Sequence, residues 1–282
     1  MTVEAGLQRP RQQWLNHMHS VRSALVTVLG TYVYADPAPV STTAFVRGLG
    51  LLGFNEKAIR QALIRARNSN LLSSVKSGRR TFWELSGPGL ALMDEGMQRL
   101  GSLNREGSRW DGRIYLVSVD APERDRAIRH TIKTRLGWAG FASIGSTLWV
   151  STHPMAEKVA QHLMAELGLP SFSLVAERGA IGDLHQVIRE AWDLPAVESQ
   201  YRQFIDEFGG MQPRSPDDFF VAQAQITHQW RRFPFTDPGL PLELAPSQWP
   251  GQQARTLYRR LRTQWKGPAV KRWRELSQLG DR

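Results

Sequence analysis

Residues 55–85 read NEKAIRQALIRARNSNLLSSVKSGRRTFWEL, and this stretch decides the predicted fold of the N-terminal region. Asn55 is a favourable helix N-cap, and Glu56 suits the positive end of a helix dipole. One face of the stretch, at 3.6 residues per turn, is apolar and would pack inward. It consists of Ile59, Ala62, Leu63 and Ala66. The sequence therefore predicts a capped amphipathic helix over residues 55–67.

The remaining surface of this predicted helix is basic. From residue 55 to residue 80 the chain has seven Lys or Arg residues and one acid, Glu56, so seven minus one gives a net charge of +6. Such a concentration of cations indicates a polyanionic partner. The cations are Lys57, Arg60, Arg65, Arg67, Lys76, Arg79 and Arg80, and Gln61 and Ile64 share the exposed face of the helix.

A hairpin is predicted directly after the helix. Leu71–Val75 and Thr81–Leu85 are expected as short strands joined by residues 76–80, in which Gly78 provides the backbone freedom of a tight turn. A basic helix followed by a two-stranded wing is the plan of a winged helix-turn-helix. The helix of such a fold enters the major groove, and the wing holds flanking phosphates or a minor groove. The alternative interpretation is a solvated basic helix beside an ordinary hairpin.

Neighbouring segments complete a predicted winged-helix domain over residues 20–101. Residues 20–35 have the apolar spacing of a buried helix face, although β-branched pairs weaken their helix propensity. After a proline-rich break, Ser41 would cap a helix from Thr42 to Leu51. A further helix is expected from residues 86–89 to about Leu100, and the polar residues 1–19 are expected to form a flexible arm. The DNA-binding candidates are Thr42, Lys57, Arg60, Gln61, Arg65, Lys76, Arg79 and Arg80.

Four segments of the chain together resemble PaaX-type transcriptional repressors. Residues 23–30 (SALVTVLG), 59–63 (IRQAL) and 78–83 (GRRTFW) look like the N-terminal part of that family, and residues 228–241 (HQWRRFPFTDPGLP) look like a distal part. Each segment is weak alone, but the spaced set is specific. Residues 59–63 also resemble the Val-Arg-Glu-Ala-Leu pattern of GntR-type winged helices. The arginine of that pattern contacts DNA, and this role carries over to Arg60.

The resemblance implies a repressor of genes for the catabolism of phenylacetate or related aromatic acids. It implies release from DNA by an aryl-CoA thioester such as phenylacetyl-CoA, and a middle domain similar to the small Cas2 nucleases. We expect a homodimer that presents two recognition helices to a palindromic operator, with half-sites about one or two helical turns apart. Effector binding in the distal regions would shift the dimer to a state whose helices no longer match the half-sites.

A second domain is predicted over residues 110–178. Strands are expected at 113–119 and 171–176 and helices at 121–136 and 154–167, with a hairpin formed by 138–144 and 147–151. This βαββαβ order is ferredoxin-like, as the Cas2 resemblance also implies. The fold class expected for the whole chain is therefore α+β, with a winged helix-turn-helix, a ferredoxin-like domain and a helical domain over residues 180–282.

The Cas2 resemblance raises a rival function, that of a metal-dependent nuclease or another nucleic-acid-processing protein. Asp120 ends the first predicted strand, where Cas2-type nucleases place an aspartate, and two copies in a dimer could hold a divalent cation. Aspartate is also favoured before a helix, so Asp120 could simply cap the helix that opens at Ala121. Dimerisation is the preferred role for this domain, because the nuclease hypothesis rests on fold analogy.

The C-terminal region is predicted to be helical and rich in aromatic residues. Helices are expected at 197–208 and 217–233, and the region contains five tryptophans, most of which should lie in a core. One cluster could instead form an effector pocket, in which apolar rings hold an aryl group and cations hold the phosphates of CoA. A lone helical histidine such as His228 is more often structural. The effector-binding candidates are His228, Trp230, Arg231, Arg232 and Phe233.

Composition limits the remaining classes of function. Residues 1–110 hold 14 Lys or Arg and 7 Asp or Glu, whereas the charges of the remaining sequence nearly balance, as expected for one DNA-binding end. The 282 residues include no cysteine, which excludes disulfides and thiolate metal sites. No membrane-length apolar run or signal core is present, so we expect a cytoplasmic protein without a membrane partner. The common nucleophile, P-loop and dinucleotide motifs are absent, so we expect no enzyme activity, cofactor or metal.

Overall fold

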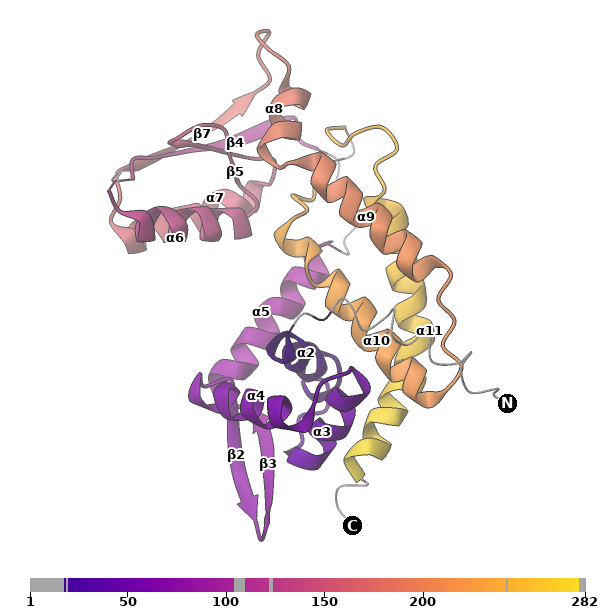
Figure 1. Cartoon of the computed structure of the whole chain (residues 1–282). Helices are drawn as coiled ribbons and strands as arrows, with labels where there is room; N and C mark the ends of the chain where they lie inside the picture. The colour runs from indigo at the N-terminus through magenta and orange to yellow at the C-terminus, as the bar shows by residue number, and fades with distance from the viewer. Residues whose placement is uncertain (1–17, 19, 104–109, 122–123, 242, 279–282) are drawn as a thin grey trace. The chain divides into compact units, whose positions relative to one another are not determined.

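Two antiparallel sheets and the helices around them make up the chain, which has a mixed α+β structure (Figure 1). The computed structural model describes Met18 and residues 20–103, 110–121, 124–241 and 243–278. Its contacts define two compact units. The first contains residues 1–101, 204–231 and 253–282, and the second contains residues 102–203 and 232–252.

Polar caps set the starts of the first three helices in the described part of the first unit. Helix α2 (Val21–Val28) continues as a π-helical segment, η2 (Leu29–Val33), so the predicted helix over 20–35 is present with wider final turns. Helix α3 (Thr42–Leu51) is capped by Ser41, and α4 (Glu56–Asn68) is capped by Asn55. Both caps are the residues that the sequence predicts, because a side-chain oxygen at this position satisfies a free helix amide.

A three-stranded sheet follows α4 in the first unit. Strands β2 (Leu72–Ser77) and β3 (Arg80–Leu85) form a hairpin, and the two-residue strand β1 (Val40–Ser41), which the sequence analysis did not predict, pairs with the other edge of β3. The hairpin strands are longer than predicted, because Ser77 pairs with Arg80 and leaves a two-residue turn. Helix α5 (Gly87–Leu103) then begins at the predicted place.

The predicted arm over residues 1–19 falls outside the described residues, except for Met18. The side chain of Met18 is buried and belongs to the hydrophobic core of the first unit. The described end of this segment is therefore anchored by packing.

Two C-terminal helices complete the core of the first unit. They are α10 (Pro216–Trp230) and α11 (Gly251–Gln278), and their side chains share one hydrophobic cluster with α2, α3 and α4. Trp273 of α11 stacks on Tyr32 with ring centroids 5.7 Å apart and lies 5.8 Å from the ring of Phe45 on α3. The Tyr32 hydroxyl donates to the backbone carbonyl of Phe220 at 3.0 Å. In this packing α10 and α11 share the core of the first unit, and the division of the chain into three consecutive domains stays a prediction.

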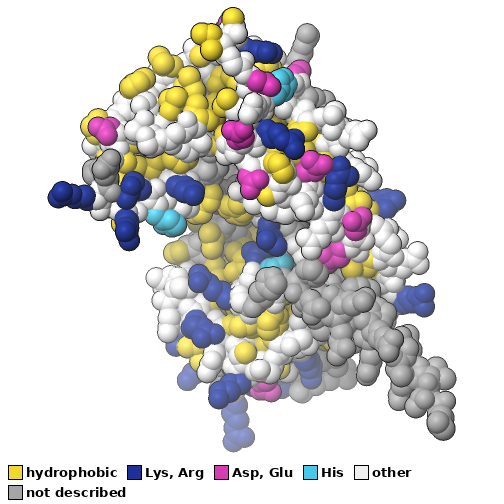
Figure 2. Space-filling view, turned by 45° about the horizontal axis from the view of Figure 1, so that its top comes forward, with side chains coloured by type: hydrophobic (Ala, Val, Ile, Leu, Met, Phe, Trp, Pro, Cys, Tyr) yellow, Lys and Arg dark blue, Asp and Glu magenta, His cyan; other side chains and the backbone are white. Residues whose placement is uncertain are grey.

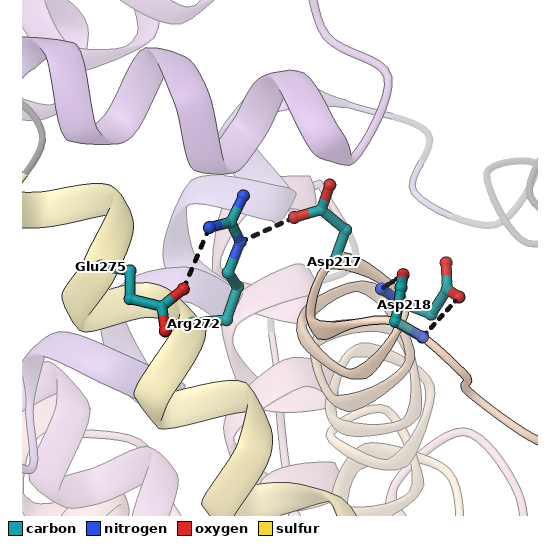
Figure 3. A network of polar contacts seen from close by, with 5 residues as sticks. Asp217, Asp218, Arg272 and Glu275 are labelled. Atoms are coloured by element: carbon teal, nitrogen blue, oxygen red, sulfur yellow. Dashed lines mark hydrogen bonds and ion pairs between the residues drawn. The ribbon is translucent and has the colours of Figure 1, made fainter.

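A polar network also joins α10 to α11. The guanidinium of Arg272 donates to Asp217 at 2.7 Å and to Glu275 at 3.0 Å, as Figure 3 shows. Burial opposes the charge of Arg272, but the two carboxylates outweigh this effect and raise its pKa. Asp218 completes a capping box with Ser215, which fixes the start of α10.

The second unit is built on a four-stranded antiparallel sheet. Its strands are β4 (Arg113–Val119), β5 (Ala142–Ser143), β6 (Leu148–Ser151) and β7 (Ser171–Glu177), in the order β5-β6-β4-β7. Helices α6 (Arg126–Trp138) and α7 (Pro154–Leu167) pack their apolar residues against one face of the sheet. The succession of elements and the strand order are those expected for a βαββαβ plan.

Two boundaries in this unit differ from the sequence prediction. Asp125 caps α6 through the amide of Ile128, so the helix does not open at residues 121–123, and residues 122–123 lie outside the described part of the chain. Trp138 ends α6, although it was predicted to begin a strand. Helix assignment from periodicity has little power at such ends, where one cap residue decides the boundary.

The second unit also contains α8 (Leu184–Ala191), most of α9 (Leu194–Gly209) and a short 3-10 turn, η3 (Phe233–Phe235). Helix α10 ends at Trp230 rather than at Phe233 as predicted. Phe233 stacks on Tyr201 of α9 with ring centroids 4.0 Å apart. The turn is therefore held by ring packing rather than by continuation of the helix.

Candidate nucleic-acid interface

Helix α4 separates its apolar and basic side chains onto two faces. Ile59 and Leu63 are fully buried, and Ala62 and Ala66 are nearly so, which confirms the predicted inward face. The Asn55 side chain accepts the amide of Ala58 at 2.9 Å and fixes the first turn. The residues that remain exposed on the outer surface are Lys57, Arg60, Gln61, Ile64, Arg65 and Arg67. A rigid helix therefore presents five donor-rich side chains around one apolar residue.

Arg60 is held in place by the residue one turn before it. Its Nε lies 2.7 Å from a carboxylate oxygen of Glu56, and both side chains are more than half exposed. An exposed pair of this kind contributes only about 0.3–0.5 kcal/mol. A phosphate or a guanine edge can therefore replace Glu56 as the partner of Arg60 at little cost.

The hairpin β2–β3 extends past the helices of the first unit (Figure 1) and contains three further cations. Gly78 has a φ of +58°, which suits the first position of a two-residue hairpin turn, and Arg79 occupies the second. Lys76 and Arg80 belong to the strands, although both were predicted to lie in the turn, and neighbouring registers place them on opposite faces of the hairpin. All three cations are exposed, so the tip can reach phosphates on either side.

Thr42 has a different position from the other DNA-binding candidates. Its hydroxyl donates to the backbone carbonyl of Thr81 at 3.1 Å and accepts the indole N–H of Trp83 at 2.8 Å. A hydroxyl has one hydrogen to donate, and this one is already used. Thr42 therefore attaches the hairpin to the start of α3 and has no donor for a phosphate in this arrangement.

Trp83 is a site-forming residue that the sequence analysis did not single out. Its ring is 5% exposed and it sits in the core of the unit, so the N–H must find an internal partner. Thr42 is that partner. The signal in the sequence was the position of the tryptophan on the strand after a basic turn, but the partner lies 41 residues away.

Basic side chains gather on the surface of the first unit, which contains α4 and the hairpin. Figure 2 shows Lys and Arg side chains, with few acidic side chains among them, toward the end of the molecule from which the hairpin projects. A strongly basic helix also belongs to this unit, since α11 holds eight Lys or Arg residues and the single acid Glu275. A surface of this kind attracts a polyanion before any specific contact forms.

Comparison with known families covers three successive parts of the chain. The model of PaaX-like proteins matches residues 20–89, the model of the PaaX protein central Cas2-like domain matches residues 107–182, and the model of the PaaX-like protein C-terminal domain matches residues 192–275. A curated relative is the transcriptional repressor PaaX of Escherichia coli (strain K12). It is 30% identical over 233 residues, which are 77% of this chain and 70% of the relative. The chain belongs to the PaaX family.

A solved structure has a similar fold. It is the uncharacterized protein Rv0674 from Mycobacterium tuberculosis, which covers 90% of this chain and 98% of its own, with a TM-score of 0.59 and 20% sequence identity. At this identity the likeness concerns the fold. The family models follow the three predicted segments of the sequence, whereas the compact units join the first segment to parts of the third.

Membership in the PaaX family places the chain among transcriptional regulators rather than enzymes. The rival nuclease function is not favoured. Asp120 is exposed directly after β4 and does not cap α6, whose cap is Asp125. Within the described ranges no three His, Cys, Asp or Glu residues gather into a possible metal site, and none of the described helices is long and apolar enough to cross a membrane.

The effector-binding candidates occupy packed positions. Trp230 has no exposed surface and stacks on Tyr258 with ring centroids 4.4 Å apart, and Phe233 is 3% exposed. Trp230 and Arg231 belong to the first unit, and Arg232 and Phe233 belong to the second. Of these candidates only Arg232 is exposed. Trp230 can therefore line an apolar slot only if it separates from Tyr258, and Phe233 only if it separates from Tyr201.

His228 and Arg231 connect the end of α10 to α2. His228 Nδ1 lies 3.0 Å from the Thr27 hydroxyl, and Arg231 Nη2 donates to the carbonyl oxygen of Ser23 at 3.2 Å and also to its hydroxyl. His228 is 6% exposed, which agrees with the structural alternative stated for it. These contacts tie the end of α10 to α2, the helix on which the basic helix α4 packs.

Proposed function

We propose that this protein is a transcriptional repressor whose first unit is a winged helix-turn-helix. In this proposal α3 and α4 form the helix-turn-helix, α4 is the recognition helix, and β2–β3 is the wing. The observation that carries it is the surface of α4, where buried apolar residues hold the helix rigid while exposed Arg, Lys and Gln side chains face outward. Family membership supports the same function, because the curated relative is a transcriptional repressor.

The exposed residues divide by the contacts that they can make. Arg60 and Gln61 lie early on α4 and can form paired hydrogen bonds with base edges in the major groove. Lys57 and Arg65 flank them and would contact phosphates. Lys76, Arg79 and Arg80 of the wing would contact phosphates or a narrow minor groove.

We further propose that the repressor acts as a homodimer on a palindromic operator. Each copy has one recognition helix, and a dimer with twofold symmetry matches an inverted repeat with half-sites about one or two helical turns apart. Occupation of a promoter would then block transcription. The dimer is also the form in which a change of geometry is most effective, because both helices must match the DNA at the same time.

The proposed effector is an aryl-CoA thioester that controls an operon for aromatic-acid catabolism. The support is the family to which the chain belongs, together with the cationic and aromatic cluster of His228, Trp230, Arg231, Arg232 and Phe233. CoA phosphates would compete with Ser23 for Arg231, and an aryl ring would displace one of the stacked rings. Release of Arg231 would free the end of α10 from α2 and so alter the support of α4.

Selection from a random duplex pool tests DNA recognition without knowledge of the operator. The full chain should enrich an inverted repeat. On that repeat, Arg60→Ala or Gln61→Ala should weaken binding by about 1–3 kcal/mol, with a smaller loss on unrelated duplex. Arg189→Ala, an exposed arginine on α8, is the matched control and should leave both affinities unchanged. Equal losses on selected and unrelated duplexes would contradict base reading by α4.

Calorimetric titration tests the effector separately. Phenylacetyl-CoA, other acyl-CoA thioesters and their free acids would each be titrated into the full chain, with and without the selected duplex. A bound thioester should weaken operator binding about 5- to 150-fold, the usual range of allosteric coupling. The free acids should do much less, because they lack phosphates. Binding of a free acid without any thioester would refute the proposed pocket chemistry and leave the DNA-binding proposal intact.

A further inference from the structure

Strand β7 is an edge strand with unusual exposure. It pairs with β4 on one side, and within the described ranges no strand pairs with its other side. Phe172 is 61% exposed, Leu174 is 54% exposed and Val175 is 48% exposed. Natural edge strands are usually protected by lysine, proline or a bulge. Residues 171–176 read SFSLVA without charge or proline, and the register with β4 runs without a bulge over all seven residues of the strand.

The hydrogen-bonding direction of each residue in β7 follows from its neighbours. The amide of Asp120 donates to the carbonyl of Pro170 at 3.1 Å, whereas the amide of Val119 donates away from β7, to Thr147 at 2.9 Å. Backbone groups of successive residues in an antiparallel strand point to opposite sides. The even-numbered residues of β7 therefore bond to β4. The residues whose N–H and C=O groups point outward are Ser171, Ser173, Val175 and Glu177.

We infer that β7 pairs with β7 of a second copy of this chain, antiparallel and about a twofold axis at Leu174. This inference rests on the proposed dimeric repressor and names its interface. In this register residue 171 lies opposite residue 177 of the other copy, and residue 173 lies opposite residue 175. Outward-pointing residues thus meet outward-pointing residues along the whole strand, and about eight backbone hydrogen bonds can form. The two four-stranded sheets become one continuous sheet.

The side chains of β7 suit its own copy as partner. Leu174 lies opposite Leu174 of the second copy, and Phe172 lies opposite Ala176, on the face turned away from α6 and α7. Glu177 lies opposite Ser171, so no like charges meet. A twofold interface must be complementary to itself, and β7 meets this condition because residues 171–176 carry no charge and Glu177 of each copy faces a serine. Its single charge, on Glu177, gives little basis for selecting a different protein.

Cysteine cross-linking tests both the interface and its register, because the chain has no cysteine of its own. Leu174→Cys places two thiols opposite each other in a non-hydrogen-bonded pair, with Cα atoms about 4.5 Å apart, a separation that a disulfide spans. In Phe172→Cys the two Cα atoms are four residues out of register, roughly 14 Å apart. The control is Leu92→Cys on α5, where the leucine is 51% exposed. Mild oxidation should give a covalent dimer for Leu174→Cys and leave the protomers of the other two variants without a covalent link.

The mass in solution provides a second measurement. The wild type and Leu92→Lys should be dimers. Leu174→Lys and Val175→Pro should be monomers that are still folded by circular dichroism. Proline at residue 175 removes an outward N–H and leaves the bonds to β4 intact. A monomeric wild type, a dimeric Leu174→Lys, or cross-linking of Phe172→Cys in place of Leu174→Cys would overturn the inference.

The outcomes also separate this inference from the proposed function. A monomeric Leu174→Lys should still bind a duplex with a single half-site, because α4 and the wing are unchanged, and should lose the tighter binding to the inverted repeat. Dimers that cross-link at residue 174 and bind no DNA would refute the repressor and retain the interface. A wild type that binds DNA as a monomer would refute the interface and retain DNA binding by α4 and the wing.

Discussion

Gly48 and Gly50 of helix α3 provide a direct test of the packing of α11 against the N-terminal helices of the first unit. A Cβ atom added at Gly48 would lie 2.8 Å from Cζ3 of Trp273 and 3.3 Å from Cζ of Phe220, whereas one added at Gly50 would meet no atom within 4 Å. Ordinary carbon contacts are about 3.5–4.0 Å, so Trp273 must move by more than half an ångström. The Trp273 side chain is 5% exposed and packs on the rings of Tyr32, Phe45 and Phe220, which leaves it little room.

The expected changes in the free energy of unfolding differ between the two positions. Alanine in place of glycine stabilises a helix interior by roughly 0.5–1 kcal/mol, and this gain applies to both. At Gly48 it is offset by overpacking, which costs about 1–3 kcal/mol. Gly50→Ala should therefore be more stable than the wild type, and Gly48→Ala should be less stable than Gly50→Ala by about 1–3 kcal/mol. Each kcal/mol corresponds to about 2–4 °C in Tm.

Urea unfolding followed by tryptophan fluorescence measures this difference in the full chain. Truncation of the opposing ring in Trp273→Leu should relieve the strain, so that Gly48→Ala then stabilises that background. If Gly48→Ala is as stable as Gly50→Ala in the wild-type background, α11 does not pack on α3 as described. The shared core of α11 with α2, α3 and α4 would then be wrong as well.

Three further predictions concern the same unit. Thr42→Val should lower the free energy of unfolding by about 1–2 kcal/mol, because it leaves the indole N–H of Trp83 without its acceptor. The control, Thr43→Val on the exposed side of α3, should change this free energy little. Equal urea midpoints for the two variants would contradict the Thr42 contact. Arg272→Ala should lower the free energy of unfolding by about 1–2 kcal/mol, because its partners Asp217 and Glu275 are partly shielded from solvent. The control is Arg274→Ala, whose pair with Asp36 is mostly exposed, and it should cost about 0–0.5 kcal/mol in the same assay. Replacement of Arg79 and Arg80 together by alanine should reduce the slope of log affinity against log salt by about one to two units, and the pair Arg126→Ala and Arg129→Ala on α6 is the control; an unchanged slope would remove the wing from the interface.

Most local elements of the candidate site could be predicted from sequence. The cap at Asn55, the buried face of α4 and the turn at Gly78 follow from spacing, capping and backbone freedom, which act over a few residues. Boundaries were less accurate where one residue decides them. Asp125 rather than Asp120 caps α6, and the pairing of Ser77 with Arg80 lengthened the hairpin and moved Lys76 and Arg80 out of the turn.

The sequence by itself determined most helices and strands of residues 20–178, the cations of α4 and the hairpin, and the resemblance of the chain to PaaX repressors. It did not predict β1, α8 or α11. Tertiary structure decided what those elements pack against. Thr42 holds Trp83 across 41 residues, and His228 meets Thr27 across 201 residues, so no local pattern could pair them. In the same way, only the folded chain shows that α10 and α11 enter the core of the first unit. Periodicity shows that a helix has an apolar face, but only the folded chain shows which partner covers it.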